Sequence, residues 1–531
     1  MTSILAAGAA TAPGLTAPHI EYGQLSPMLL IYGLAVVGVL VEAFAPRHLR
    51  RPLQLALTLG GLVAAFALTI VVASSNTLFA GGSPGNAAAV GTVGVDQPTL
   101  FIQGTILVLA FISVLLIAEQ AHDISPFAAP AAAVPGSAEE REGLAAGAVH
   151  TEVYPLVLFA VGGMMLFPAA NDLLTMFVAL EVLSLPLYLL CGIARRRRLL
   201  SQEAAMKYFL LGAYSSAFFL FGVAMLYGFS GSVRLSAIAT AASSNTSSTT
   251  LLYAGMALLG LGLLFKIGAA PFQSWKPDVY QGAPTPVTAL MASCVLVSAF
   301  GALLRVFYVA FGQLSWNWRP VMWGVAILTM LAGSVIAITQ TDVKRLLAYS
   351  SIAQAGYVLT AVVATSQAGL SSSLFYLAAY GIAVIGAFAV VTLVRGPAGE
   401  ALHLSSWAGL GRRAPLVAGT FAFFLIAFAG IPLTSGFTGK FAVFQAAIAG
   451  GALPLVIVGV LSSAILAFPY VRVIVLMYFS DPAPDGPSVV RPSVFTGAAV
   501  AVGAIGTLVL GVVPGPLLNL AQHAASNLFV R

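Results

Sequence analysis

Four ionisable side chains stand inside long apolar stretches of this sequence: Glu181, Lys207, Lys266 and Lys440. An ionisable group at the centre of a membrane helix costs about 2.5–3.5 kcal/mol on insertion scales, so it is kept mainly where a partner, water or a function requires it. A carboxylate and several lysines on neighbouring helices can pass protons, because each group takes up and releases a proton as its partner moves. The four residues are therefore candidates for a proton relay.

Two of the four also have a structural interpretation. Glu181 lies near the middle of the run NDLLTMFVALEVLSLPLYLL, where a neutral carboxyl could hold two helices together by a hydrogen bond. Lys207 follows Glu203 by four residues, which is the spacing of a plain ion pair on a helix surface. The length of the following apolar run favours a position of Lys207 below the lipid headgroups. Both alternatives remain open on sequence grounds.

Lys266 and Lys440 each lie beside a predicted helix break. Gly268 and Pro271 follow Lys266, and Gly430 and Pro432 precede Lys440. Broken backbone at membrane depth is tolerated only inside protein or beside water. The two breaks fall in the seventh and twelfth predicted helices, and this odd separation reverses their direction across the membrane. Inverted repeats with discontinuous helices are typical of secondary transporters, so the sequence predicts two inverted units.

The composition requires that lipid be the solvent of most of this chain. Of its 531 residues, 59% are hydrophobic and 8% are charged, whereas a soluble domain has about 25% charged residues. A span needs about 20 mostly apolar residues, and the sequence predicts an all-α polytopic membrane protein with about fourteen transmembrane helices. The predicted spans are residues 27–46, 53–74, 100–119, 153–168, 171–193, 200–229, 251–280 (interrupted), 284–310, 320–338, 346–366, 372–394, 414–449 (interrupted), 453–479 and 493–521.

These spans divide the chain into four parts. Residues 1–151 hold three N-terminal helices with flexible loops, 152–310 the first repeat, 311–480 the second repeat, and 481–531 a C-terminal helix. Residues 75–99 and 120–151 are expected to lie outside the membrane, and we assign no chemistry to them.

The basic residues indicate the orientation of the chain. With the N-terminus outside, fifteen of the 23 Lys and Arg fall in cytoplasmic loops, Lys276 and Lys344 among them, and three fall outside. This bias follows the positive-inside rule, and it places both termini outside the plasma membrane of a bacterium. The net charge of +6 then reflects basic loops, and the run Arg195–Arg198 is expected to anchor the topology. No nucleic-acid partner is needed.

No residue pattern predicts a redox cofactor or a metal in this chain. Cys191 and Cys294 are expected to be small buried hydrophobes, and the six histidines have no metal-ligand spacing. There is no GxGxxG opening a βαβ unit, no cysteine cluster for iron–sulfur and no pair of axial ligands. Any NADH, flavin, iron–sulfur or quinone chemistry is therefore expected in partner subunits.

Five segments resemble the antiporter-like subunit N of proton-translocating NADH:quinone oxidoreductase, respiratory complex I. The resemblance extends from about residue 152 to 480 and is carried by LEVLSLPLYLL, EAAMKYFLLGAYSSAFFLFGVAMLYG, KPDVYQGAPTPVTALMA, DVKRLLAYSSIAQAGY and GIPLTSGFTGKF. It implies fourteen helices with two inverted five-helix units, and other membrane subunits of complex I, especially antiporter-like ones, as partners. It also implies that redox chemistry occurs in other subunits while this chain moves protons.

The resemblance assigns roles to the four charged residues. Glu181 matches the glutamate of helix five in this family and Lys207 matches its partner lysine of helix six. Lys266 and Lys440 match the lysines of the two broken helices. Asp278 matches a recurrent position, expected to be a cap or a lysine partner.

Two positions depart from the family pattern. Gln273 stands where a histidine is usual, and Gln cannot take a proton. An alignment without gaps puts Leu296 where a helix-eight lysine is usual. The central link between Lys266 and Lys440 is then missing, or it is carried by water and by neutral groups such as those of Ser293, Ser298 and Tyr380.

Three other functions compete with a complex I subunit. A subunit of a multi-subunit cation/proton antiporter would share the fold, although the LSLPLY and MKYFLLGA wording favours complex I. A self-contained solute transporter would need further midplane charges for an organic substrate, and the sequence has none. A purely structural membrane subunit remains an alternative because of Leu296.

Overall fold

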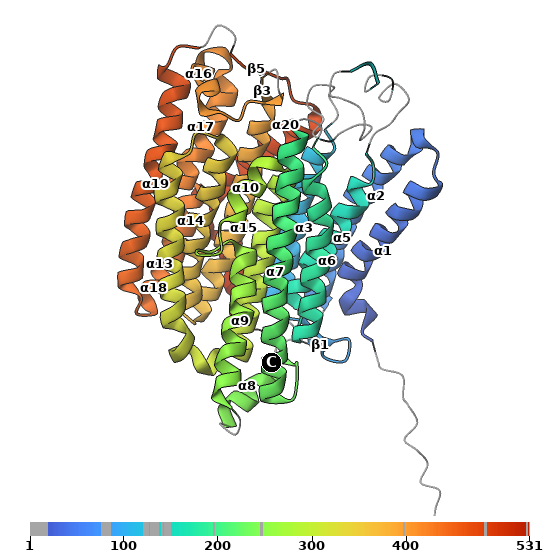
Figure 1. Cartoon of the computed structure of the whole chain (residues 1–531), viewed down its shortest axis with the longest axis vertical. Coiled ribbons are helices and arrows are strands. Elements are labelled where there is room, and N and C mark those ends of the chain that lie inside the picture. The colour runs from blue at the N-terminus through green and yellow to red at the C-terminus, as the bar shows by residue number, and fades with distance from the viewer. Residues whose placement is uncertain are drawn as a thin grey trace, which may run out of the picture.

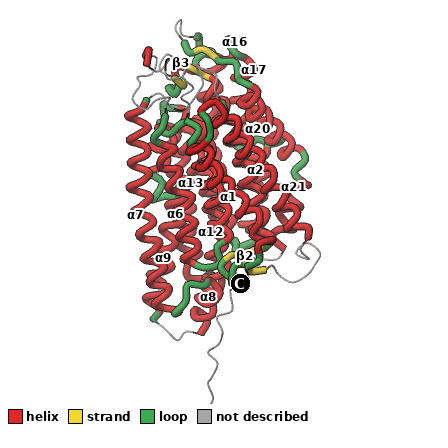
Figure 2. The backbone as a smooth tube through the Cα atoms, turned by 90° about the vertical axis from the view of Figure 1, so that its right-hand side faces the viewer, coloured by secondary structure: helices red, strands yellow, loops and turns green. Residues whose placement is uncertain are grey.

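The chain is a bundle of long helices that run along one axis (Figure 1). The computed structural model describes residues 20–75, 86–119, 127, 137–139, 142, 150–194, 197–244, 248–396, 399–482, 486–526 and 529. Residues 1–19, 76–85, Arg195, Arg196 and most of the predicted loop at 120–151 lie outside the described residues. A perpendicular view shows that helices make up almost all of the described backbone (Figure 2).

In the described part of the chain, twelve helices are long and apolar enough to span a membrane. They are α1 (Tyr22–Phe44), α2 (Arg47–Ser75), α3 (Gln97–Ile117), α6 (Leu173–Cys191), α7 (Arg198–Ser230), α9 (Thr249–Ile267), Thr285–Ala310, α13 (Ser315–Thr339), α14 (Val343–Val363), α15 (Gln367–Leu393), α19 (Leu453–Phe479) and α20 (Val494–Val512). The segment Thr285–Ala310 consists of α11 (Thr285–Leu290), the π-helical turn η2 (Met291–Val295), α12 (Leu296–Arg305) and a second π-helical turn, η3 (Val306–Ala310).

The two remaining predicted spans are also helical. One is the shorter helix α5 (Val153–Leu166), which continues into the 3-10 turn η1 (Phe167–Ala169). The other is the broken pair α17 (Pro415–Ala429) and α18 (Ser435–Ala449). Each of the fourteen predicted spans therefore corresponds to a helix or a broken helix, and the predicted all-α polytopic membrane fold is confirmed.

Short elements occupy the ends of the bundle. They are α8 (Leu235–Ser244), α10 (Trp275–Gly282), α16 (Leu410–Arg413), α21 (Gly515–Ser526), η4 (Gly312–Leu314), η5 (Leu404–Trp407), β1 (Asn86–Ala88), β2 (Val93–Val95), β3 (Val394–Gly396), β4 (Gly399–Glu400) and β5 (Ser488–Val489). Strands β1 and β2 form an antiparallel pair, and β3 lies between β4 and β5 in a small antiparallel sheet. The start of α1 and the C-terminal end lie toward the same end of the bundle, as an even number of crossings requires (Figure 1).

The core of the bundle is formed by Thr285–Ala310, α14 and α15, which are almost wholly buried. The outer helices instead expose large apolar side chains, for example Val36 on α1, Leu210 on α7 and Val460 on α19. Exposed aliphatic side chains around a buried core are suited to contact with apolar lipid. The helices also satisfy their own backbone hydrogen bonds there.

Both predicted helix breaks are present. α9 ends at Gly268 with φ +77°, and α17 ends at Gly430 with φ +83°. This left-handed conformation favours glycine, which has no Cβ to clash with the following carbonyl. The chain then resumes as α10 in the first case and as α18 in the second. The two breaks leave carbonyl groups at the ends of α9 and α17 without helical partners.

Candidate proton-relay site

Lys266 lies in the last turn of α9 and is buried at the meeting point of three helices. Its Nζ donates hydrogen bonds to Ser184 Oγ of α6 at 2.7 Å and to Tyr208 Oη of α7 at 3.1 Å. The ammonium also lies over the Tyr208 ring, 5.2 Å from its centroid. The side chain therefore points between α6 and α7 rather than toward lipid, as a proton-carrying group must.

Glu181 lies on the same side of α6 as this cluster. Ser184 follows Glu181 by three residues, so the two side chains share one face of the helix. The Glu181 carboxylate acts electrostatically on both Lys266 and Tyr188. Its buried Oε1 atom has no hydrogen-bond partner among the described residues, and a buried carboxylate oxygen of this kind is a natural site for a bridging water.

The expected pairing of Lys207 with Glu181 is wrong. Lys207 Nζ binds Glu203 Oε1 at 2.7 Å and Asp278 Oδ2 at 2.8 Å, and its side chain is 41% exposed. Successive residues of a helix point about 100° apart, and Tyr208 is the residue that faces Lys266. Lys207 consequently points away from α6, toward α10.

Asp278 is confirmed as a lysine partner. Its second carboxylate oxygen, Oδ1, accepts a hydrogen bond from Arg345 Nη1 at 2.6 Å. Asp278 therefore joins α7, α10 and α14.

Lys440 lies one turn and a half into α18 and reaches back to the break. Its Nζ donates to the carbonyl oxygens of Phe428 at 2.8 Å and Ala429 at 3.0 Å, and to Ser463 Oγ of α19 at 2.7 Å. It also lies 4.8 Å from the centroid of the Tyr357 ring. The lysine thus neutralises the exposed carbonyl end of α17, which carries partial negative charge.

A cavity of about 360 Å³ opens beside this lysine. It is lined by Lys440 and Ser463 together with apolar side chains of α17, α18 and α19. Lys440 and Ser463 thereby place polar groups at the boundary between the buried core and this cavity.

A line of polar groups approaches Lys440 from the centre of the chain. Gln354 Nε2 of α14 donates to the Phe428 carbonyl at 3.1 Å, the same oxygen that Lys440 binds. Tyr376 of α15 donates to Gln354 Oε1, and its ring stacks on Tyr380 with the centroids 6.5 Å apart. Sequence reasoning missed Gln354 and Tyr376, although a glutamine inside the apolar run YSSIAQAGY was a usable signal.

The line continues toward α10 through hydroxyl groups. Ser351 Oγ lies near the hydroxyls of both Tyr280 and Tyr380. Neither Ser351 Oγ nor Tyr380 Oη has a hydrogen-bond partner among the described residues. Buried hydroxyls without a partner are expected to bind water.

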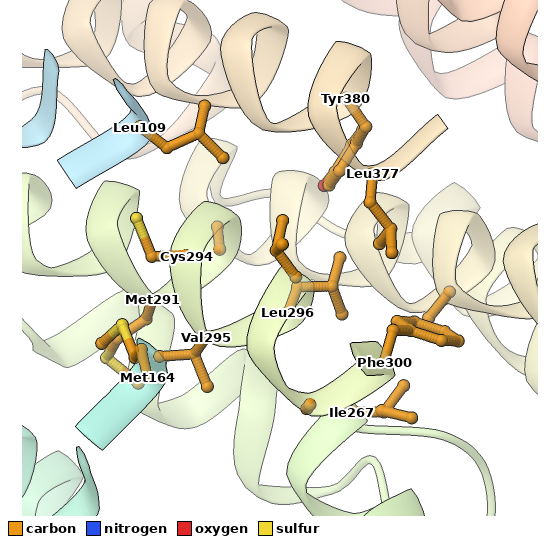
Figure 3. Packing of buried hydrophobic residues seen from close by; sticks show 14 of the residues in the cluster. Leu109, Met164, Ile267, Met291, Cys294, Val295, Leu296, Phe300, Leu377 and Tyr380 are labelled. Carbon is orange, nitrogen blue, oxygen red and sulfur yellow. The ribbon is translucent and has the colours of Figure 1, made fainter. Parts of the chain in front are cut away.

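Among the residues labelled around Leu296 in Figure 3, Tyr380 is the one that belongs to this polar line. Leu296 is 3% exposed and belongs to the apolar cluster that also contains Cys294, Val295, Phe300 and Leu377 (Figure 3). Two candidates for the missing link, Ser293 and Ser298, donate instead to the backbone carbonyls of Ala289 at 2.7 Å and Met164 at 2.8 Å. Tyr380, the third candidate, lies on the line described above.

Two buried lysines were misplaced by the sequence analysis. Lys276 and Lys344 were expected in cytoplasmic loops, but each is 1% exposed. Lys276 Nζ donates to the Ile267 carbonyl at 3.2 Å, and Lys344 Nζ donates to the Ala283 carbonyl at 2.7 Å. Lys344 lies in the first turn of α14, which begins three residues before the predicted span, and Lys276 lies in the first turn of α10, just after the helix break; both side chains reach inward to backbone carbonyls.

The remaining predicted features concern metals and cysteines. Cys191 and Cys294 are buried and free. Within the described ranges no group of three or more His, Cys, Asp or Glu side chains is placed to hold a metal ion. Gln273 Oε1 is buried and lacks a hydrogen-bond partner in the same ranges.

The family described as NADH:quinone oxidoreductase/Mrp antiporter, transmembrane, matches residues 170–466. A relative from Rhodococcus opacus, NADH-quinone oxidoreductase subunit N, is 62% identical and is covered over 98% of each chain. This chain belongs to the NADH:quinone oxidoreductase/Mrp antiporter family. Within the family, a chain of respiratory complex I from Thermus thermophilus is 32% identical, with a TM-score of 0.72 over 93% of this chain and 99% of that one. A chain of the Mrp complex from Dietzia sp. DQ12-45-1b has a TM-score of 0.79 over 96% and 98%, but at 23% identity it shows the fold alone.

Proposed function

We propose that this chain is a proton-translocating membrane subunit, of the subunit N type, in a bacterial NADH:quinone oxidoreductase. Relatives that carry this name match 97–100% of the chain at 59–62% identity. The likeness to the Mrp complex is much weaker in sequence, so it does not favour a cation/proton antiporter. The redox chemistry belongs to other subunits of the complex. This chain contributes buried lysines that carry protons across the membrane.

The observation that carries the proposed relay is that the Phe428 carbonyl accepts hydrogen bonds from both Lys440 and Gln354. The protonatable Lys440 thus stands at one end of a line of amide and hydroxyl groups that leads into the core. The Glu181 and Lys266 cluster supplies protonatable groups in the first unit. We assign Lys207, held by Glu203 and Asp278, to the exposed edge of the relay rather than to a pair with Glu181.

The same proposal covers the domain division and the orientation. Residues 152–310 and 311–480 would form the two inverted units, each with one broken helix, between the three helices within residues 1–151 and the C-terminal helix within 481–531. The end of the bundle with α16 and β3 carries Arg412, Arg413 and Arg395. We place this basic end in the cytoplasm and both termini outside the plasma membrane.

Glu181→Gln tests the relay in the first unit. The amide keeps the shape of the side chain but cannot carry a proton or a charge, so the number of protons pumped per NADH oxidised is expected to fall severalfold. The measurement is proton uptake and NADH oxidation in membrane vesicles, with the amount of assembled complex checked on native gels.

Glu152→Gln is the matched control for this experiment. Glu152 precedes α5 and its side chain is 55% exposed beside His150, so removal of its charge should leave pumping unchanged. Wild-type pumping by the Glu181→Gln complex would reduce Glu181 to a packing residue.

A further inference from the structure

Lys276 and Lys440 occupy equivalent positions at the two helix breaks. A Cβ on Gly268 would stand 2.7 Å from Lys276 Cδ, and a Cβ on Gly430 would stand 2.9 Å from Lys440 Cδ. Both lysine stems therefore lie against the glycine that ends the first half of their broken helix. Both ammonium groups then reach the carbonyl of the residue just before that glycine, since Lys276 binds Ile267 and Lys440 binds Ala429.

This equivalence shows that Lys276, and not Lys266, is the structural counterpart of Lys440. Lys266 stands two residues before Gly268, and Phe428 stands two residues before Gly430. The counterpart of Lys266 is thus an aromatic side chain, whereas the counterpart of Lys440 is Lys276. The first broken helix consequently holds two buried lysines, and the second holds one.

A structural ion pair does not account for the buried charge of Lys276. No ion pair joins Lys276 to a carboxylate in the part of the chain that the structure describes. Its ammonium binds one carbonyl and lies 5.6 Å from the centroid of the Tyr280 ring. A neutral donor such as glutamine could cap that carbonyl without the cost of burying an ammonium group.

Lys276 also lies between the two halves of the relay. The carbonyl that it binds belongs to Ile267, the residue next to Lys266, and its other neighbour Tyr280 lies near Ser351 on α14. On the alternative route, Leu296 is 3% exposed and packs in the apolar core. Lys276 thereby contacts the helix break next to Lys266 on one side and Tyr280, which lies beside Ser351, on the other.

We propose that Lys276 is a proton-carrying residue that links the Lys266 cluster to the polar line leading to Lys440. The inference rests on the proposed function, because a proton carrier has a role only if the chain moves protons. The step itself is a proton transfer: the Lys276 ammonium gives one proton to a water or hydroxyl on the Tyr280 side and takes one from the Lys266 side.

The test is a set of substitutions in the assembled complex. Lys276→Gln keeps a donor for the Ile267 carbonyl, Lys276→Arg keeps the donor and the fixed charge, and Lys276→His keeps a group that can take up and release a proton near neutral pH. Protons pumped per NADH oxidised should fall severalfold with Gln and with Arg, whose guanidinium effectively never deprotonates. The His variant should pump more than either.

A matched control removes a hydrogen bond without removing a titratable group. Thr288 Oγ1 donates to the Tyr280 carbonyl at 3.2 Å, so Thr288→Val takes a side-chain donor from the end of α10 and should pump normally. Wild-type pumping by the Gln or Arg variant would overturn the inference, because Lys276 would then serve only as a cap or a fixed charge. Failure of all three Lys276 variants to assemble would overturn it as well, because the residue would be structural.

Lys440→Gln in the same assay separates the inference from the proposed function. Loss of pumping with Lys440→Gln but not with Lys276→Gln would reject the role of Lys276 and leave the proposed function intact. Normal pumping by both variants would reject both.

Discussion

Lys440→Ala is expected to abolish most proton pumping and, where coupling is tight, to slow NADH oxidation as well. Lys440 lines the cavity between α17, α18 and α19, and its ammonium binds the Phe428 and Ala429 carbonyls at the end of α17. Without it, the line through Gln354 ends at a backbone oxygen that cannot carry a proton onward. Paired measurements of NADH oxidation and proton uptake, in vesicles with equal amounts of assembled complex, check this result.

Lys440→Arg distinguishes a proton carrier from a fixed positive charge. Arginine can donate to the Phe428 and Ala429 carbonyls and keeps the charge, but it does not release a proton under physiological conditions. We therefore expect the arginine variant to assemble and to pump as poorly as the alanine variant. If it pumped at the wild-type rate, the relay role of Lys440 would have to be abandoned.

Ser463→Ala serves as the control for geometry. It removes one of the three hydrogen bonds of the Lys440 ammonium but no titratable group. Pumping should fall much less with this change than with either substitution of Lys440, since the carbonyl contacts that position the lysine remain.

The broken helices could be predicted from the sequence because their signals are local. A glycine and a proline within a few residues, beside a lysine in an apolar run, identify both breaks without knowledge of the neighbouring helices. The left-handed backbone at Gly268 and Gly430 follows directly from that pattern. The helix count was equally accessible, because each span depends only on its own apolar length.

Partners across helices could not be predicted in the same way. Whether Lys207 or Tyr208 faces Lys266 depends on the rotation of α7 about its axis, and the apolar run before and after these residues does not fix that rotation. The resemblance supplied Lys207 as the partner of Glu181. The structure instead has the ion pair of Lys207 with Glu203, the alternative that the spacing of four residues offered, and a second ion pair with Asp278.

The positions of Lys276 and Gln354 depend on tertiary structure too. A lysine between Trp275 and Pro277 looks like part of a polar loop, and only the folding of α10 back against Gly268 buries it. Gln354 is polar and central, but its role follows from a carbonyl that is freed by the break in another helix. A sequence pattern on one helix carries no information about such a contact.

A buried ion pair joins Arg305 of α12 to Asp96, the residue that precedes α3. Arg305 Nη2 binds Asp96 Oδ2 at 2.7 Å, with the two side chains 0% and 2% exposed. Arg305 Nε also donates to the Pro168 carbonyl at 2.6 Å, so this arginine joins α12 to η1 and to the start of α3. Asp96 has a second task, since its Oδ1 accepts from Thr99 N at 3.0 Å and caps α3.

Asp96→Asn is expected to lower the free energy of unfolding by about 3–5 kcal/mol, because it leaves the Arg305 guanidinium buried without its counter-charge. Asparagine is as good an N-cap as aspartate, so the cap is kept. Asp96→Ala would also remove the cap and lose about 1 kcal/mol more.

Asp172→Asn is the matched control. Asp172 caps α6 through Leu174 N and Thr175 N, is 5% exposed, and makes no ion pair within the described residues. Thermal unfolding of the purified complex, followed by the loss of the intact subunit on size exclusion, measures the difference. Equal melting of the Asp96→Asn and Asp172→Asn complexes would show that the Arg305 charge is compensated without Asp96, and the ion pair would then contribute little to the stability of the bundle.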